Sequence, residues 1–159
     1  MAPEPREGRA TSRYVISIRR ATAVDHEVIN AIVQGSSAYD GVYRAMLDGY
    51  EVPLSQVVQE ETWLATDGAD ALGFYSLVLE PEPELDLMFV ADSEQGRGVG
   101  RLLFEHMRAL AKARGVAAVK IVSHPPARDF YRRMGAIEVG LAYPARNVTW
   151  VRPILSLPV

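Results

Sequence analysis

Short stretches of alternating or mainly apolar residues recur along the chain, and this pattern is typical of β-strands. It predicts strands over residues 14–19, 61–66, 71–80, 84–91, 116–122, 136–141 and 147–154. Asp67-Gly68 is a typical tight-turn dipeptide and joins the second and third of these strands as a hairpin. A turn around Pro144 joins the last two strands.

A helical pattern is strongest after residue 98, where Gly115 supplies the C-terminal stop. Apolar residues there fall mostly on one stripe, formed by Val99, Leu102, Leu103, Phe104, Met107 and Leu110. Thr22 is a helix N-cap residue with Asp25 three positions later, so a first helix is predicted to run to about residue 34.

Three further segments are less periodic. Residues 38–47 are predicted to form a second helix, and residues 125–135 a short helix that begins at two prolines. The pattern at 53–59 leaves helix and loop open. The resulting element order is β-α-α-β-β-β-α-β-α-β-β. The strands on either side of the long helix are largely apolar, which favours a crossover unit packed on a central sheet, and hence an α/β fold.

The chain has 159 residues without an internal repeat or a linker, which indicates one domain over residues 14–159. Residues 1–13 contain prolines and arginines but no apolar core of a signal peptide, so we expect a flexible tail. No apolar run approaches the roughly 20 residues that span a bilayer. These features predict a cytoplasmic protein without a membrane partner.

Composition excludes several chemistries. The chain has no cysteine, which rules out disulfides, thiol catalysis and cysteine-bound metals. His26, His106 and His124 lack metal-ligand spacing, so no metal is predicted. With 17 basic and 20 acidic residues, the net charge is −3, and this lack of a basic excess argues against nucleic acid as a partner.

The segment from Gln95 to Gly100 lies between a predicted strand and the long helix. A helix N-terminus carries unpaired N–H groups and partial positive charge, and glycines let an anion approach the backbone. A P-loop would need Lys-Ser or Lys-Thr after Gly100, and the G-x-G-x-x-G spacing of a dinucleotide site fails from either Gly96 or Gly98. A pyrophosphate site and a turn without a ligand remain open.

The same segment resembles the Q/R-x-x-G-x-G/A motif of the GCN5-related N-acetyltransferases (GNAT family), with matches at Gln95, Gly98 and Gly100. Further along, residues 124–135 are similar to the N-x-x-A-x-x-F-Y-x-x-x-G-F segment of that family. The resemblance implies the GNAT fold, a mixed and mostly antiparallel sheet of about seven strands with a parallel pair formed by its fourth and fifth strands. About four helices flank that sheet. The resemblance to this family also implies that acetyl-CoA is a cosubstrate.

The resemblance assigns a set of cofactor-binding positions. His124 stands where the family has an asparagine, and its imidazole offers a substitute donor. Ala136 replaces an aromatic residue, which affects packing. The implied cofactor-binding residues are Met88, Phe89, Val90, Gln95, Gly96, Arg97, Gly98, Val99, Gly100, Arg101, His124 and Phe130.

Tyr131 matches the tyrosine that the family places near the sulfur of coenzyme A. A phenol is mostly protonated at neutral pH and can protonate a leaving thiolate. The alternative is a tyrosine that only packs between helix and sheet.

Glu84 and Asp86 are candidates for the general base or for an anchor of a cationic substrate. Strand alternation places them on one face with Met88 and Val90, opposite Leu85, Leu87 and Phe89. The alternative is a solvated strand end, because Glu80, Glu82 and two prolines are close in sequence.

These residues predict an N-acetyltransferase that transfers the acetyl group to a primary amine of a small molecule by direct attack in a ternary complex. Ser36, Ser37, Tyr39, Asp40 and Tyr43 lie in the region that varies with the acceptor in this family. A protein or peptide acceptor, another acyl donor and a non-catalytic acyl-CoA-binding module are the alternatives. Dimers are common in the family, and a homodimer stays open here.

Overall fold

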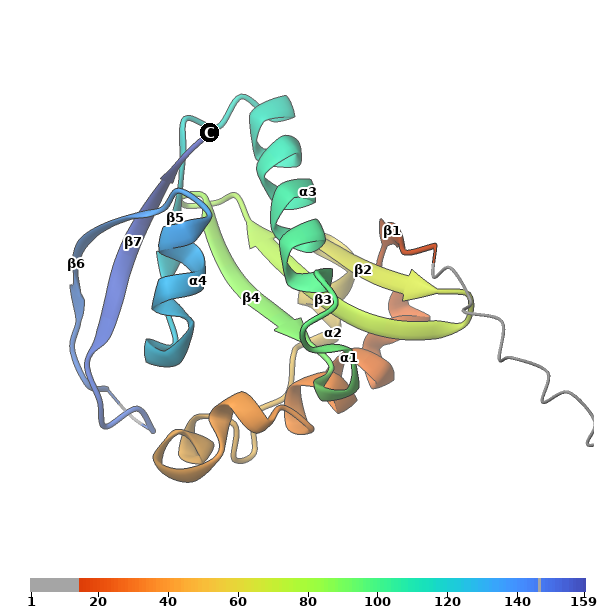
Figure 1. Ribbon diagram of the computed structural model, residues 1–159, viewed down its shortest axis with the longest axis horizontal. Coiled ribbons are helices and arrows are strands. Elements are labelled where there is room, and N and C mark those ends of the chain that lie inside the picture. Colours follow the sequence, from red (N-terminus) through yellow and green to blue (C-terminus); the bar gives the residue numbers. More distant parts are fainter. Residues whose placement is uncertain (1–14, 146) are drawn as a thin grey trace, which may run out of the picture.

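The computed structural model describes residues 15–145 and 147–159, which form a seven-stranded sheet with helices on both faces (Figure 1). The strand order is β1-β2-β3-β4-β5-β7-β6, and only β4 and β5 are parallel. The strands are β1 (Ser17–Arg20), β2 (Glu61–Asp67), β3 (Asp70–Val78), β4 (Glu84–Val90), β5 (Ala118–Val122), β6 (Ile137–Ala142) and β7 (Arg152–Pro158). The predicted mixed sheet with one parallel pair is confirmed. The predicted tail at residues 1–13 lies outside the described residues.

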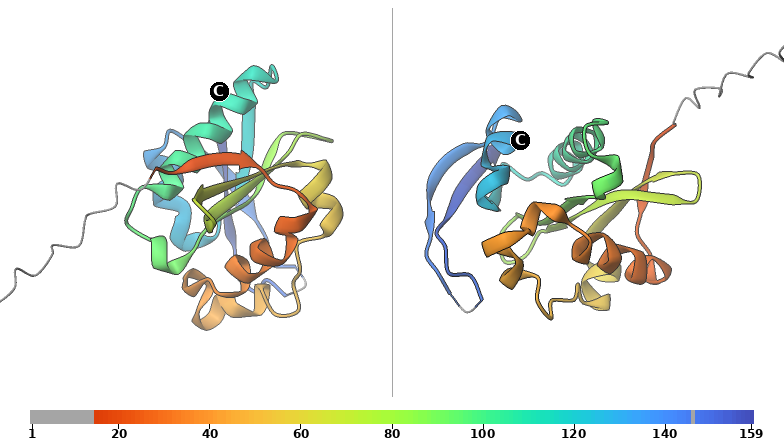
Figure 2. Two further views of the ribbon diagram at one scale, coloured as in Figure 1. Left: turned by 90° about the vertical axis from the view of Figure 1, so that its right-hand side faces the viewer. Right: turned by 60° about the horizontal axis from the view of Figure 1, so that its bottom comes forward.

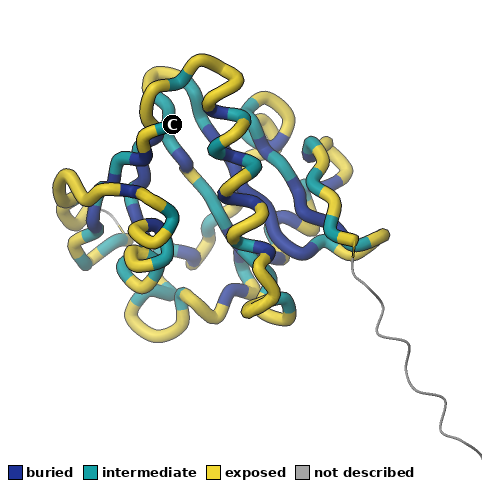
Figure 3. The backbone as a smooth tube through the Cα atoms, turned by 45° about the horizontal axis from the view of Figure 1, so that its top comes forward, coloured by how far each residue is buried: buried dark blue, intermediate teal, exposed yellow. Residues whose placement is uncertain are grey.

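Two layers of helices cover the sheet (Figure 2). The α-helices are α1 (His26–Gln34), α2 (Leu54–Gln59), α3 (Val99–Ala113) and α4 (Arg128–Arg133). The 3₁₀ helices are η1 (Ala23–Asp25), η2 (Ser37–Tyr39), η3 (Gly41–Met46), η4 (Asp92–Glu94) and η5 (Pro125–Ala127). One apolar core joins α3 and α4 to one face of the sheet, and a second joins α1 and α2 to the other. The central strands are accordingly the most buried (Figure 3). In the part of the chain described, no helix is long and apolar enough to cross a membrane.

Helix α3 follows the predicted stripe with one exception. Leu102 is 46% exposed, because it lies a quarter-turn away from the buried positions. The buried residues of the helix are Val99, Leu103, Phe104, Met107 and Ala111. Spacings of three and four residues place them on the face that meets the sheet.

The predicted helix at 38–47 is wrong. Asp40 is extended, with ψ 154°, and Gly41 has φ 75°, so the chain breaks into the short turns η2 and η3. The ambiguous segment at 53–59 is helix α2, which buries Val57 against the second core.

The last strand lies further along the chain than predicted. The prediction of 147–154 followed the β-forming residues of that stretch, yet a turn closed by the bridge between Ala145 and Val148 occupies its start. Strand β7 begins at Arg152 because it pairs on both sides, with β5 and with β6. Pairing with two neighbours outweighs local preference and the two prolines that β7 contains.

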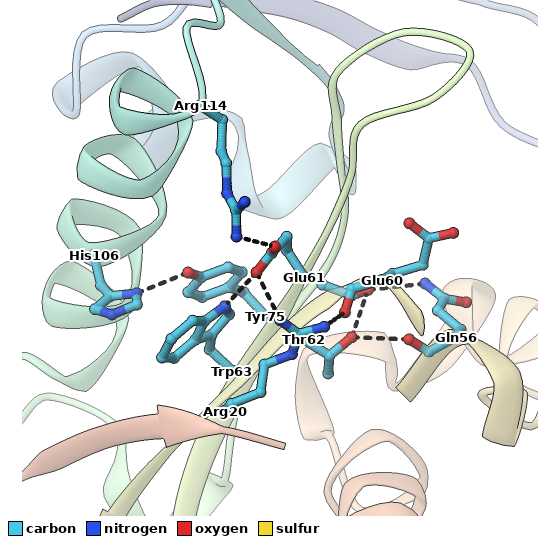
Figure 4. A network of polar contacts seen from close by, with 10 residues as sticks. Arg20, Gln56, Glu60, Glu61, Thr62, Trp63, Tyr75, His106 and Arg114 are labelled. Carbon is cyan, nitrogen blue, oxygen red and sulfur yellow. Dashed lines mark hydrogen bonds and ion pairs between the residues drawn. The ribbon is translucent and has the colours of Figure 1, made fainter. Parts of the chain in front are cut away.

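A polar network ties β2 and β3 to α3 beside the first core (Figure 4). Glu61 accepts hydrogen bonds from Arg20, Trp63 and Arg114 at 2.6–3.0 Å. The Tyr75 hydroxyl lies 2.7 Å from Nδ1 of His106. His106 is thus bound within the scaffold, on the side of the sheet away from α1.

Candidate active site

The parallel strands β4 and β5 separate soon after they meet. A single register pair, Glu84 with Lys120, joins them, supported by the Lys120 N–H donating to the Pro83 carbonyl at 2.9 Å. Beyond this point lies a cavity of about 680 Å³, lined by residues of β4, of the end of β5, of α3 and of α4. The two halves of the sheet therefore splay apart around this cavity, and Figure 1 shows the ribbon of β4 running away from α4.

The glycine segment forms one wall of this cavity. Gly96 and Gly98 both have φ 78°, a left-handed conformation that favours glycine, and Gly98 is the N-cap of α3. No side chain caps this 15-residue helix, so its first N–H groups have no partner within it. The Gln95 side chain donates to the Val90 carbonyl at 3.1 Å and fixes the segment to the end of β4. These features fit an anionic group such as a pyrophosphate.

Nearly all of the predicted cofactor-binding residues lie around this cavity. Arg97 lies outside the lining, where its guanidinium pairs with the Glu94 carboxylate. The predicted positions that line the cavity are Met88, Phe89, Val90, Gln95, Gly96, Gly98, Val99, Gly100, Arg101, His124 and Phe130.

The predicted faces of β4 are partly wrong. Leu77 pairs with Leu85 but Ser76 pairs with Leu87, so Asp86 is an extra residue in a β-bulge. After the bulge the alternation is inverted: Leu85 packs in the core under α3, whereas Leu87 packs against the core under α1. The predicted grouping of Leu85 with Leu87 and Phe89 is therefore wrong, as is that of Asp86 with Met88 and Val90. Met88 and Val90 face the α3 side, while Asp86 faces α2, where it accepts a hydrogen bond from Gln56 at 2.7 Å.

Both candidate carboxylates line the cavity. Burial raises the pKa of Glu84, and the nearby negative charge of Asp86 raises it further. Lys120, the register partner of Glu84, pairs instead with Glu82 at 3.0 Å. Glu84 is therefore a half-buried carboxyl group whose protonated form is favoured relative to an ordinary glutamate.

Tyr131 lies on α4 at the bottom of the cavity and is 8% exposed. Its ring packs edge-on against Phe130, with 5.4 Å between ring centroids. Burial, with a smaller effect of Tyr39, raises the pKa of the Tyr131 phenol. The hydroxyl is therefore protonated at neutral pH and available as a donor.

His124 closes the cavity from the side of η2. A carbonyl oxygen only accepts, so Nε2 of His124 donates to Ala38 at 2.7 Å, and the ring stacks on Tyr39 at 3.9 Å. Burial lowers the pKa of His124, so the imidazole is neutral and its Nδ1 is an acceptor. That Nδ1 is buried and has no hydrogen-bond partner among the described residues.

Sequence reasoning missed Tyr50 and Arg152 as cavity residues. Tyr50 follows a turn, and Arg152 alternates with buried residues of β7, so each has the pattern of an ordinary surface position. Only the path of the chain brings them to the cavity. Among the residues that the structure describes, no group of His, Asp and Glu could hold a metal ion.

The fold, the splayed strands and the glycine wall define an acyl-coenzyme A type of site, and comparison with known proteins identifies the family. The Acetyltransferase (GNAT) domain matches residues 42–155. The chain belongs to the GNAT acetyltransferase family, which confirms the resemblance found in the sequence. The peptidyl-lysine N-acetyltransferase YjaB of Salmonella typhimurium is 27% identical over 150 residues, which cover 86% of this chain and 99% of that protein.

Solved structures have the same fold. A GCN5-related N-acetyltransferase from Rhodopseudomonas palustris superposes with a TM-score of 0.79 at 20% identity, over 91% of this chain and 96% of that one. The paia N-acetyltransferase from Thermoplasma acidophilum, in complex with coenzyme A, gives 0.73 at 14% identity, over 91% and 99%. The yncA protein from Salmonella typhimurium, with its cofactor acetyl-CoA, gives 0.71 at 15% identity, over 91% and 94%.

Proposed function

We propose that this protein transfers the acetyl group of acetyl-CoA to a primary amine of a small molecule by direct attack in a ternary complex. The observation that carries the proposal is the single cavity that joins the glycine wall to Tyr131 and to the carboxylates of β4. The solved relatives that hold coenzyme A or acetyl-CoA support acetyl-CoA as the donor.

The residues suggest a division of roles. The first turn of α3 and the Gln95–Gly100 segment bind the pyrophosphate. The amine nitrogen attacks the thioester carbon, and a backbone N–H on the free edge of β4 stabilises the oxyanion. As the carbon–sulfur bond breaks, the sulfur takes the proton of the Tyr131 hydroxyl. The proton released by the amine goes to Glu84, directly or through water.

A small acceptor fits the way the cavity is enclosed. Tyr39 lies between Phe89 of β4, at 5.5 Å between ring centroids, and His124 beyond β5, at 3.9 Å. This stack bridges β4 and the end of β5 on the acceptor side, which favours a small acceptor. A peptidyl-lysine acceptor is the second candidate, because the relative YjaB is named for that activity.

Release of coenzyme A, measured by thiol titration, tests the proposal against a panel of small amines and a lysine-containing peptide. We expect turnover of small amines at higher kcat/KM than of the peptide. A higher kcat/KM for the peptide favours the second candidate, and acetyl-CoA binding without turnover favours a non-catalytic module.

The Tyr131→Phe variant tests whether the Tyr131 hydroxyl is the general acid that protonates the leaving sulfur. Loss of the hydroxyl should lower kcat by at least about tenfold, because the thiolate then leaves without a proton donor, while KM for acetyl-CoA stays within a factor of about three. The matched control is Tyr143→Phe, since Tyr143 is 75% exposed and lies outside the cavity. Unchanged kcat in Tyr131→Phe, with an unchanged melting temperature, would rule out the acid role.

A further inference from the structure

Arg152 brings a positive charge to the acceptor side of the cavity. It is the first residue of β7, and the burial pattern of that strand alternates. Leu155 and Leu157 face the core under α3, so Arg152 faces the opposite side, toward α1 and η2. Arg152 lines the cavity together with Glu84, Asp86 and Tyr39.

The guanidinium of Arg152 has no protein partner in residues 15–145 and 147–159. Its Nε is buried without a hydrogen-bond partner. The carboxylates that form ion pairs within this part of the chain do so with other cations, and Glu82 of the neighbouring loop pairs with Lys120. An arginine in a partly desolvated site is most stable opposite a carboxylate or a phosphate, which it binds with two parallel hydrogen bonds.

The charge of Arg152 acts on the acceptor end of the cavity. Burial raises the pKa of Tyr39 to about 12, and Arg152 opposes that rise. Arg152 also lowers the pKa of Glu84, against the larger effect of burial. The glycine wall lies at the first turn of α3, on the other face of the sheet from Arg152. Arg152 is thus placed to act on the acceptor rather than on the pyrophosphate.

The acceptor end therefore carries both signs of charge, two carboxylates on β4 and one guanidinium on β7. Glu84 and Arg152 interact only at long range, since no ion pair of 4.0 Å or less joins them within the described chain. A ligand with an ammonium group and an acid group would meet both charges, whereas a simple amine would leave the guanidinium unpaired.

We infer that the acceptor is an amine that also carries a carboxylate, as a free amino acid does, and that Arg152 binds this carboxylate. The inference rests on the proposed function and names its substrate class. The ammonium group lies toward Glu84 and Asp86, and it loses its proton there before attack. Arg152 determines specificity and takes no part in the transfer itself.

Matched pairs of acceptors that differ only in the carboxylate test the inference. We use lysine against 1,5-diaminopentane and phenylalanine against 2-phenylethylamine, with coenzyme A release as the readout. The carboxylate member should have at least about tenfold higher kcat/KM in at least one pair, mostly through KM. Arg152→Gln should abolish this preference by raising KM for the carboxylate member of the pair, and it should leave KM for acetyl-CoA unchanged. Arg152→Lys should restore part of it, because the charge remains without the planar fork.

Arg128→Gln is the control, because Arg128 lies on α4 outside the cavity and pairs with Asp129. It should keep the preference. Equal use of both members of each pair by the wild-type protein overturns the inference but leaves the proposed function intact. An increase in KM for acetyl-CoA in Arg152→Gln, without loss of preference, overturns it by assigning Arg152 to the donor. Absence of turnover with every amine overturns the proposed function, and the inference falls with it.

Discussion

Glu84 and Asp86 share a wall of the cavity but differ in their surroundings. Asp86 is exposed and accepts a hydrogen bond from Gln56, whereas Glu84 is half-buried and accepts none among the described residues. Burial, then the charge of Asp86, raises the pKa of Glu84, and Lys120 and Arg152 act in the opposite direction. A carboxylate with a raised pKa is a stronger base, which suits Glu84 better than Asp86 to accept a proton from the amine.

This difference predicts an acidic limb in the pH profile of kcat/KM. Below its raised pKa Glu84 is protonated and cannot act as base, so activity should fall as pH decreases through a value above the ordinary glutamate pKa of about 4.3. Glu84→Gln should lower the plateau about a hundredfold and remove the limb. Asp86→Asn should move the limb to lower pH, because one of the charges that raise the pKa of Glu84 is gone.

The profile is measured with saturating acetyl-CoA from pH 4 to 9, the range over which the protein's folding is checked by circular dichroism. A limb that persists in Glu84→Gln and disappears in Asp86→Asn would transfer the role of base to Asp86.

At the level of single elements, the start of α3 carries the proposed donor site. The two left-handed glycines turn the chain so that Val99 opens the helix, and the next residue, Gly100, lies beside the cavity. A Cβ on Gly100 would lie 3.6 Å from Val90 and 3.8 Å from the Phe130 ring, which are ordinary contacts. A methyl group is therefore tolerated at Gly100, in line with the G/A position of the motif.

Gly100→Ala should retain both stability and coenzyme A binding. Alanine in a helix is favoured over glycine by about 0.5–1 kcal/mol, so the melting temperature should stay or rise. The affinity for coenzyme A, measured by calorimetry, should stay within a factor of about three, because the motif accepts alanine at this position and the new methyl group meets only Val90 and Phe130. Gly98→Ala is the contrasting variant: its φ of 78° makes it strained, so it should lose both stability and coenzyme A affinity. Unchanged coenzyme A affinity in Gly98→Ala would place the pyrophosphate elsewhere.

Across the whole molecule, the two halves of the splayed sheet are joined again on the acceptor side. Tyr39 stacks between Phe89 and His124, and Tyr43 meets the His124 ring edge-on at 4.6 Å. The N–H of Ser37 also donates to the Asp92 carboxylate at 3.1 Å. The segment of η2 and η3 is thus fixed to both halves, and its ring contacts to the second half are His124 and Trp150, which meets Tyr43 edge-on at 5.0 Å.

His124→Ala should release this segment. Hydrogen exchange of residues 37–46 should accelerate at least about tenfold, and KM for the acceptor should rise more than KM for acetyl-CoA. His106→Ala is the control, because His106 bonds Tyr75 on the scaffold beside α3, and it should leave exchange at 37–46 unchanged. A rise in KM for acetyl-CoA with unchanged exchange would instead support the cofactor contact that the sequence predicted for His124.

The sequence alone determined the family and the order of the elements around the long helix, and it predicted the position of the donor site. These follow from local features. The Gln95–Gly100 motif is contiguous because it shapes a single helix N-terminus, and Tyr131 lies in the same short motif as Gly135. The apolar periodicity of α3 is likewise a local feature of the sequence, because one face of the helix packs on the sheet over successive turns.

The tertiary structure decided what local pattern leaves open. The bulge at Asp86 depends on the register between β3 and β4, and it inverts the faces of β4 that alternation predicts. The position of β7 depends on pairing with two strands distant in sequence, and this pairing alone brings Arg152 to the cavity. Residues that meet only through long-range pairing leave no periodic pattern in the sequence. The glycine wall of the cavity could therefore be predicted from the sequence, whereas the position of Arg152 in the cavity could not.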